Sequence, residues 1–149
     1  MFWKKKPIIH SCGNPTGMPI RNDAGGKGYY GAPRVKKLKN GRLYRYRHKG
    51  TDYQCLPGQV VRSPMTGIIK RVAKPYASGN YSGVVIEAKR LSLRIFYFHP
   101  FPKLIGKVVK MGDEVGIAQD ISQKYKLVTP HIHVEVMSCD PEIFINQRV

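Results

Sequence analysis

The stretch "TPHIHVEV", residues 129 to 136, alternates polar and apolar side chains as a strand with one buried face requires. In such a strand His131, His133 and Glu135 project from one face, and the apolar residues between them face a hydrophobic core. One imidazole could bind a metal while the other, roughly 6 to 7 Å along the strand, reaches a water molecule or a substrate. For this pair alone, an amphipathic strand that happens to carry histidine is an equally good interpretation.

Similar β segments follow from residue 58 onward, separated by Gly, Pro, Asn or Ser and spaced as in a compact antiparallel sheet or barrel. They are "GQVVRSP", "TGIIKRVA", "SGVVIEA", "LSLRIFYFH" and "GKVVKMGDEVGIA". A helical turn is expected only around residues 118 to 127. We therefore predict a mostly β protein, a compact antiparallel sheet with barrel- or sandwich-like packing, and with 149 residues a single domain.

Residues 1 to 34 differ from the rest of the chain in composition and hydrophobic pattern. The stretch "CGNPTGMPIRNDAGGKGYYGAPR" is rich in Gly, Pro and Asn and has no apolar periodicity. We interpret residues 1–34 as an irregular arm packed on a domain formed by residues 35–149. That domain opens with "VKKLKNGRLYRYRH", where an Asn-Gly pair at 40–41 predicts a hairpin with a type I′ turn. A two-residue loop would place Leu38 opposite Leu43. The residues then expected on one face are Tyr44, Tyr46 and His48.

The charge and the apolar content restrict the class of protein. Lys and Arg total 26 against 9 acidic residues, a formal charge of +17, which favours polyanionic partners such as nucleic acid, phosphorylated wall polymers or anionic lipid headgroups. No apolar run approaches the roughly 18 to 20 residues of a membrane span, so none is expected. The start "MFWKKKPIIHSCG" has too short an apolar stretch for an ordinary signal peptide. Cys12, Cys55 and Cys139 allow at most one disulfide.

A second polar constellation is "HKGTD", from His48 to Asp52. Gly50 permits a bulge or bend that brings the imidazole and the carboxylate together. With one histidine of the 131/133 pair they would supply three zinc ligands and leave a fourth position for water, as in catalytic zinc sites. Taken alone, His48 and Asp52 are more typical of a solvated strand end.

A third place is the end of "IFYFHP", where an apolar aromatic strand finishes at His99. Alternation puts Ile95, Tyr97 and His99 on one face and the two phenylalanines between them on the other. A single histidine there is ordinarily a strand terminus. However, four of the five histidines of the chain fall in these three places, which favours a common site.

In this order and spacing, H-x-G-x-D, "PGQVVRSPMTGII", "FYFH", "GKVVKMGDEVGIA" and H-x-H resemble the lysostaphin-type zinc metallopeptidases, which cut bacterial peptidoglycan, over roughly residues 18 to 145. The resemblance implies that His48, Asp52 and His133 bind Zn²⁺. It also implies that His99 and His131 are catalytic histidines outside the ligand set, and either could be the general base.

Two further assignments depend on this resemblance, those of a tyrosine and of a disulfide, and a third, that of Glu135, depends on its place on the face of His131 and His133. Tyr30 in "GYYGAPR" matches a tyrosine that stabilises the oxyanion, with Tyr44 and Tyr46 as alternatives. Glu135 is either a partner that fixes the tautomer of an imidazole or a solvated carboxylate. Local likeness to leukocyte cell-derived chemotaxin, a signalling protein of this fold, implies that Cys12 could pair with Cys55.

The predicted function is therefore a zinc endopeptidase that hydrolyses stem or bridge peptides of peptidoglycan. We expect a monomer acting in the cell wall or periplasm as a phage lysin or virion-associated lytic enzyme, held by anionic wall polymers. The alternatives are a non-catalytic, chemotaxin-like zinc protein, against which His99 argues, and a basic nucleic-acid-binding β domain, which ranks third. "VVRSPMTGII" with "KVVKMGDEVG" also resembles biotinyl and lipoyl carrier repeats, but neither shows the carrier lysine in its context.

Overall fold

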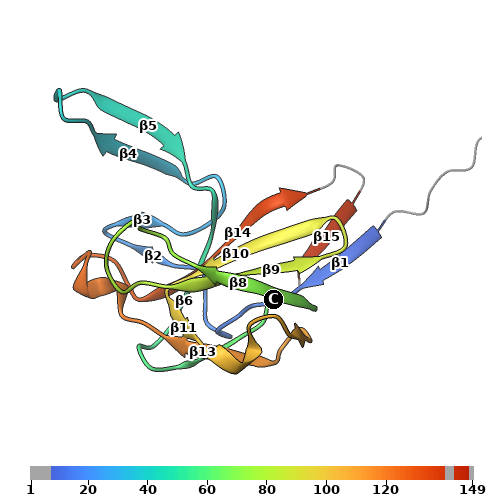
Figure 1. Ribbon diagram of the computed structural model, residues 1–149. Coiled ribbons are helices and arrows are strands. Elements are labelled where there is room, and N and C mark those ends of the chain that lie inside the picture. Colours follow the sequence, from blue (N-terminus) through green and yellow to red (C-terminus); the bar gives the residue numbers. More distant parts are fainter. Residues whose placement is uncertain (1–7, 140–142, 148–149) are drawn as a thin grey trace, which may run out of the picture.

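The structure is a computed structural model that describes residues 8–139 and 143–147, and nearly all of its regular elements are strands (Figure 1). The strands of the first half are β1 Ile8–Cys12, β2 Asn22–Asp23, β3 Gly26–Lys27, β4 Pro33–Lys37, β5 Leu43–Arg47, β6 Gly50–Gln54, β7 Val60–Arg62 and β8 Gly67–Ala73. Those of the second half are β9 Gly83–Ala88, β10 Leu91–Phe96, β11 Phe98–Pro100, β12 Val108–Val109, β13 Glu114–Ala118, β14 His131–Cys139 and β15 Ile143–Gln147. Two 3₁₀ turns complete the list, η1 Pro102–Leu104 and η2 Ile121–Gln123, and η2 lies where a helical turn was predicted.

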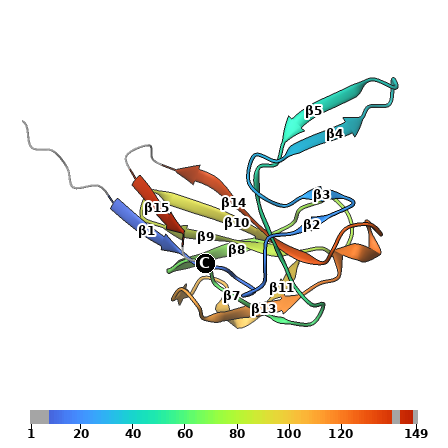
Figure 2. The ribbon, with the colours of Figure 1, turned by 180° about the vertical axis from the view of Figure 1, so that it is seen from behind.

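Two antiparallel sheets enclose the core. The larger has six strands in the order β12-β8-β9-β10-β14-β6, and the smaller has three in the order β11-β13-β7. Figures 1 and 2 show the smaller sheet lying against one face of the larger one. Both sheets are open within the described residues, so the predicted compact antiparallel β domain is confirmed as two packed sheets and not as a closed barrel.

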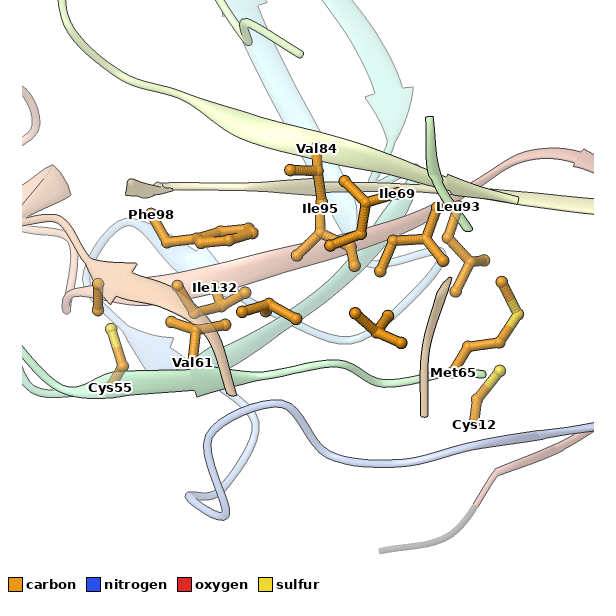
Figure 3. Close-up of a cluster of buried hydrophobic side chains, with 14 of the residues drawn as sticks. Cys12, Cys55, Val61, Met65, Ile69, Val84, Leu93, Ile95, Phe98 and Ile132 are labelled. Atoms are coloured by element: carbon orange, nitrogen blue, oxygen red, sulfur yellow. The ribbon is translucent and has the colours of Figure 1, made fainter. Parts of the chain in front are cut away.

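The core between the sheets is mostly aliphatic, with one phenylalanine and the sulfur-containing side chains of Met65, Cys12 and Cys55 (Figure 3). Ile69, Ile86 and Ile95 of the large sheet meet Val61 and Phe98 of the small one, and all five are fully buried. Central strand β9 is buried from Gly83 to Ile86, because a smaller apolar cluster covers its other face. This explains why "GVVI" is continuously apolar and does not alternate.

The passage from β10 to β11 corrects one prediction. Tyr97 takes a φ of 80°, the left-handed region that side chains rarely adopt, and it interrupts the strand between Phe96 and Phe98. Ile95 and Phe98 consequently pack in the same core cluster, whereas Phe96 and Tyr97 belong to the other. Simple alternation across this segment was therefore wrong, and His99 falls on the side away from the core.

The hairpin of β4 and β5 exists, but with a different turn. Leu38 N donates to Arg42 O at 2.8 Å, and Lys37 pairs with Leu43, so the loop contains three residues. Gly41 alone takes the left-handed conformation, with a φ of 81°. This arrangement is typical of a type I turn followed by a glycine bulge, not of a type I′ turn. Leu38 therefore lies opposite Arg42 and not Leu43.

Among the described residues before position 34, several pack on the domain and reach into it. Ala32 is fully buried, Arg21 is 4% exposed, and Ile20 forms an isolated bridge with Tyr53. The division at residue 34 stays a prediction, and it falls inside β4. Within the described ranges, no helix is both long and apolar enough to cross a membrane.

The disulfide implied by the chemotaxin likeness does not form. Cys12 and Cys55 are both buried free thiols, and Figure 3 shows them at opposite ends of the core cluster. The side chain of Cys139 lies outside the described residues.

Candidate metal centre

The register of β14 against β6 brings two predicted ligands together. His133 pairs directly with Asp52, and directly opposed residues of an antiparallel pair project from the same face. Gly50, two residues before Asp52, has its α-carbon beside the His133 ring. A Cβ at Gly50 would lie 2.6 Å from His133 Cε1 and 2.5 Å from the Val134 carbonyl oxygen. Glycine is therefore required here for close approach of the imidazole, in addition to any flexibility it gives the chain.

The three ligand atoms form a compact triangle. His48 Nε2 lies 3.2 Å from His133 Nδ1, and Asp52 Oδ1 lies 3.3 Å from His48 Nε2 and 2.8 Å from His133 Nδ1. Tetrahedral zinc ligands at roughly 2.0 to 2.1 Å from the ion stand about 3.3 Å apart. The spacing and the donor set, two imidazole nitrogens and one carboxylate oxygen, thus fit Zn²⁺.

Each ligand histidine is oriented through its second ring nitrogen. His48 Nδ1 donates to the Tyr29 carbonyl at 3.1 Å, and His133 Nε2 donates to Glu135 Oε1 at 3.0 Å. With a metal bound, these bonds would fix the tautomers in which the lone pairs of His48 Nε2 and His133 Nδ1 face the common point. Glu135 is 8% exposed and forms an ion pair with Arg94, so the solvated interpretation of this carboxylate was wrong.

Buried charges hold the centre in a defined protonation state. Burial raises the pKa of Asp52, but hydrogen bonds from His133 and His48 outweigh it and keep that pKa well below the usual range. Asp52 Oδ2 also accepts from Arg21 Nε at 3.2 Å. Burial lowers the pKa of His133, whereas its bonds to Asp52 and Glu135 raise it to about 8. A metal ion entering the site must therefore displace a proton from His133 near neutral pH.

The pKa of Glu135 follows the same pattern. Burial raises it, and the stronger effect of the hydrogen bonds from His133 and Arg94 lowers it to about 2. Glu135 therefore stays ionised at any pH at which the protein would work, and it remains an acceptor for His133.

His131 lies beside the triangle without belonging to it. Its Nδ1 donates to the Thr129 carbonyl at 2.8 Å, and its Nε2 lies 3.6 Å from Asp52 Oδ2. Burial lowers the pKa of His131 more than the Asp52 carboxylate raises it. The ring of Tyr97 packs edge-on against His131, with 5.2 Å between ring centroids. His131 is consequently a neutral, well-held imidazole with a free lone pair on Nε2.

The other two predicted catalytic residues lie outside this cluster. His99 is exposed, and its Nε2 accepts from the Gln119 side-chain amide at 3.2 Å. No hydrogen bond joins His99 to the three ligands within the part of the chain that the structure describes. Tyr30 is 73% exposed and lines a hollow together with His48 and Glu135. Tyr44 and Tyr46 lie on the projecting hairpin (Figures 1 and 2).

Sequence reasoning missed three residues that support the site. Arg21 pairs with Asp52, Arg94 pairs with Glu135, and Tyr97 packs on His131. The two arginines were indistinguishable from the other cations of a very basic chain. Tyr97 was noted only as one member of an alternating strand.

Similarity to known proteins supports the interpretation of the fold. No protein-family model matches the chain. Myeloid protein 1 of Gallus gallus is 32% identical over 131 residues, which are 87% of this chain and 37% of that protein. A zinc-containing peptidase from Vibrio cholerae superposes with a TM-score of 0.55 at 28% identity, over 83% of this chain and 35% of that one. Lysostaphin from Staphylococcus simulans gives a TM-score of 0.52 at 23% identity, over 81% and 45%.

These similarities confirm the resemblance to lysostaphin-type zinc metallopeptidases that the sequence indicated. Together with the triangle of His48, Asp52 and His133, they also confirm zinc as the predicted cofactor. The chain spans only 37% of myeloid protein 1 and 35% of the Vibrio cholerae peptidase.

Proposed function

We propose that this protein is a zinc-dependent endopeptidase that hydrolyses peptide cross-links of bacterial peptidoglycan. The observation that carries the proposal is the three-ligand triangle with a neutral histidine, His131, held beside it. Structural zinc sites use four protein ligands, whereas catalytic ones use three and leave one position open. The similarity to lysostaphin and to a zinc-containing peptidase supports the choice of reaction.

His48 Nε2, Asp52 Oδ1 and His133 Nδ1 would hold the ion. When bound, zinc supplies a Lewis acid that polarises a carbonyl and makes water acidic enough to attack at neutral pH. The protein contributes the fixed ligand orientation described above, in which the Tyr29 carbonyl and Glu135 each hold one imidazole.

His131 is the group best placed to move the proton. Because its Nδ1 donates to Thr129 O, its Nε2 carries the lone pair and faces the site. Burial keeps the ring neutral, so Nε2 can accept a proton from the attacking water and pass it to the leaving amine. We therefore assign the role of general base to His131 and not to His99.

His99 and Tyr30 would donate hydrogen bonds to the oxyanion that develops on the scissile carbonyl. The orientation of Gln119 is fixed, because its oxygen accepts from Ser82 N and its amide donates to Asn80 O. The same amide donates to His99 Nε2, which leaves Nδ1–H of His99 as the donor. A well-placed donor of this kind contributes roughly 3 to 4 kcal/mol.

The experiment is digestion of purified sacculi, with the released muropeptides identified by mass spectrometry in the presence and absence of a chelator. We expect zinc-dependent release by the wild type and a roughly 10²- to 10⁴-fold slower release by His131→Ala. Glu114→Ala, at an exposed position of β13, is the control and should behave as wild type. Absence of any released peptide with zinc present would refute the proposal.

A second candidate keeps the zinc and the fold but has no turnover. Its support is the 32% identity to myeloid protein 1, whose name refers to no peptidase activity. The variant His99→Ala separates the two functions. If neither protein digests sacculi, the non-catalytic function is favoured. If the variant digests them as the wild type does, the catalytic role of His99 is lost and the non-catalytic function is refuted.

The setting, a phage lysin or virion-associated lytic enzyme that acts in the cell wall or periplasm, stays a prediction. It requires activity against intact walls, which the same digestion measures. The monomeric state also stays a prediction, and light scattering tests it.

A further inference from the structure

The hairpin of β4 and β5, residues 33–47, is a free-standing ribbon. Figures 1 and 2 show it projecting from the two packed sheets, with neither of its faces covered by another element. Its sequence contains seven cations and no acidic residue. The cations are Arg34, Lys36, Lys37, Lys39, Arg42, Arg45 and Arg47.

Two of these cations anchor the base of the ribbon, and five are available. Arg34 donates to the Lys27 carbonyl at 2.6 Å, and Arg47 donates to the Gly31 carbonyl at 3.0 Å. The side chains of the other five form no hydrogen bond or ion pair with any residue in the described ranges. All five are exposed, so their charges are free to meet an external anion.

The ribbon exposes rings and aliphatic side chains between its cations. Tyr44 and Tyr46 stack with 5.8 Å between centroids and 17° between planes, and they are 55% and 40% exposed. The register places Lys36 opposite Tyr44. A strand edge protected from aggregation needs only the lysines. Exposed rings beside cations are also found on surfaces that bind single-stranded nucleic acid, where the rings stack on bases, so a nucleic acid is one outcome of the test below.

The base of the ribbon is tied to the metal centre. His48 directly follows β5, and its backbone N donates to the Ala32 carbonyl at 2.8 Å. On the same side, Gly31 N donates to the His48 carbonyl at 2.9 Å. A polymer held along the ribbon would therefore pass close to the proposed zinc ligands.

We infer that the ribbon binds the phosphodiester polymer that bacterial walls carry attached to peptidoglycan, and thereby holds the metal centre against its peptide substrate. This inference rests on the proposed function, because a peptidase gains from a polymer linked to its substrate. Cations project from both faces of the ribbon, with Lys36 and Arg42 on one and Lys37 and Arg45 on the other. That distribution suits a flexible single chain, which can contact both faces, better than a flat membrane or a rigid duplex.

The size of the effect follows from the number of free cations. Each phosphate neutralised on a single-stranded polyanion contributes about 0.7 to the slope of log affinity against log salt. Five contacts contribute about 3.5, which is a loss of about 100-fold in affinity between 50 and 200 mM salt.

The test compares two variants with equal net charge. The ribbon variant replaces Lys36, Lys37, Lys39, Arg42 and Arg45 with Gln. The control variant replaces five exposed lysines outside the ribbon with Gln, namely Lys70, Lys74, Lys103, Lys107 and Lys110. Each set lowers the formal charge of +17 by five. Circular dichroism and thermal unfolding establish that both variants fold. A second ribbon variant carries only two substitutions, the charge reversals Lys37→Glu and Lys39→Glu.

Binding is measured by co-sedimentation with sacculi that carry the phosphodiester polymer, with the same sacculi stripped of it by hydrofluoric acid, and by titration of a thymidine oligomer. We expect the ribbon variant to lose the salt-dependent part of binding to the untreated sacculi, and the control variant to keep it. Cleavage of a short soluble cross-linked peptide should be equal in all three proteins.

The outcomes separate this inference from the proposed function. If both variants bind untreated sacculi alike, or if stripping leaves ribbon-dependent binding intact, the inference is overturned. Tighter ribbon-dependent binding to the oligomer than to the wall polymer at equal salt also overturns it. Ribbon-dependent binding without cleavage by any of the proteins supports the inference and counts against the peptidase.

Discussion

Replacement of Glu135 with Ala is the sharpest test of the metal centre, because this residue is not a ligand. Glu135 accepts a hydrogen bond from Nε2–H of His133 at 3.0 Å, and it forms an ion pair with Arg94. Without the carboxylate, the His133 ring loses the bond that fixes its tautomer and its direction. The three ligand side chains remain, so a change in zinc affinity measures the loss of this bond to His133 and of the charge of the carboxylate.

The magnitude can be worked out from two effects. Loss of a partner outside the ligand set weakens metal binding by about 10- to 100-fold, which is about 1.4 to 2.7 kcal/mol. Without metal, a largely buried Nε2–H left without an acceptor costs about 1 to 3 kcal/mol of the free energy of unfolding. Arg94 adds little to that cost, because its side chain is 39% exposed and can turn to water.

Zinc affinity is measured by competition with a chromophoric chelator, and the free energy of unfolding by urea titration with excess chelator. Glu114→Ala is the matched control, since this carboxylate also faces an arginine, Arg62 at 3.5 Å, but on the surface. Exposed pairs contribute about 0 to 1 kcal/mol. A zinc affinity of Glu135→Ala within about threefold of wild type would refute the argument that the carboxylate orients His133.

Three further outcomes follow from the same geometry. Because the pKa of His133 is raised to about 8, zinc competes with a proton below that pH, and its apparent affinity should fall up to about tenfold per unit from pH 8 to 6 in competition titrations. A pH-independent affinity contradicts this. Asp52→Ala should abolish zinc binding and lower the free energy of unfolding by about 1 to 3 kcal/mol in urea titrations with chelator. Breaking a buried ion pair costs about 3 to 5 kcal/mol when the remaining charge has no other partner. The cost stays lower here because the Arg21 guanidinium retains its ion pair with Asp23 at 2.7 Å. Gly50→Ala should cost about 1 to 3 kcal/mol by overpacking and weaken zinc binding, because its Cβ would displace the His133 ring; unchanged zinc affinity would contradict the steric role.

The sequence predicted the sheet and the face of β14 correctly because both depend on local periodicity. A strand with one buried face must alternate, so "HIHVEV" put His131, His133 and Glu135 on one face, and all three lie at the centre. Asp52 was harder to assign, because its spacing from His48 taken alone is more typical of a solvated strand end, and the resemblance to lysostaphin-type metallopeptidases implied its role as a ligand. Periodicity was sufficient for the face of β14, whereas the choice of ligands depended on the resemblance.

Turn geometry was harder to predict because single backbone conformations decide it. An Asn-Gly pair is compatible with a two-residue turn or with a three-residue loop that ends in a left-handed glycine, and the latter forms. The two differ by one residue in register, which changes the partner of Leu38. In the same way, the positive φ of Tyr97 reverses the faces of the residues that follow it. No composition signal marks a tyrosine for this conformation, since glycine is the residue that favours it.

The groups that make three side chains into a zinc site come from parts of the chain that no local pattern connects. The Tyr29 carbonyl, Arg21 and Arg94 each hold a ligand or its partner, and the first two belong to the segment interpreted as an irregular arm. Arg21 is 4% exposed, and a buried arginine is tolerated only where carboxylates surround it. The segment before β4 is thus part of the metal centre. It supplies the guanidinium that forms an ion pair with Asp52, and the carbonyl that selects the His48 tautomer. If this segment were only a covering, its removal would leave zinc affinity unchanged, whereas the contacts of Asp52 and His48 require that affinity to fall.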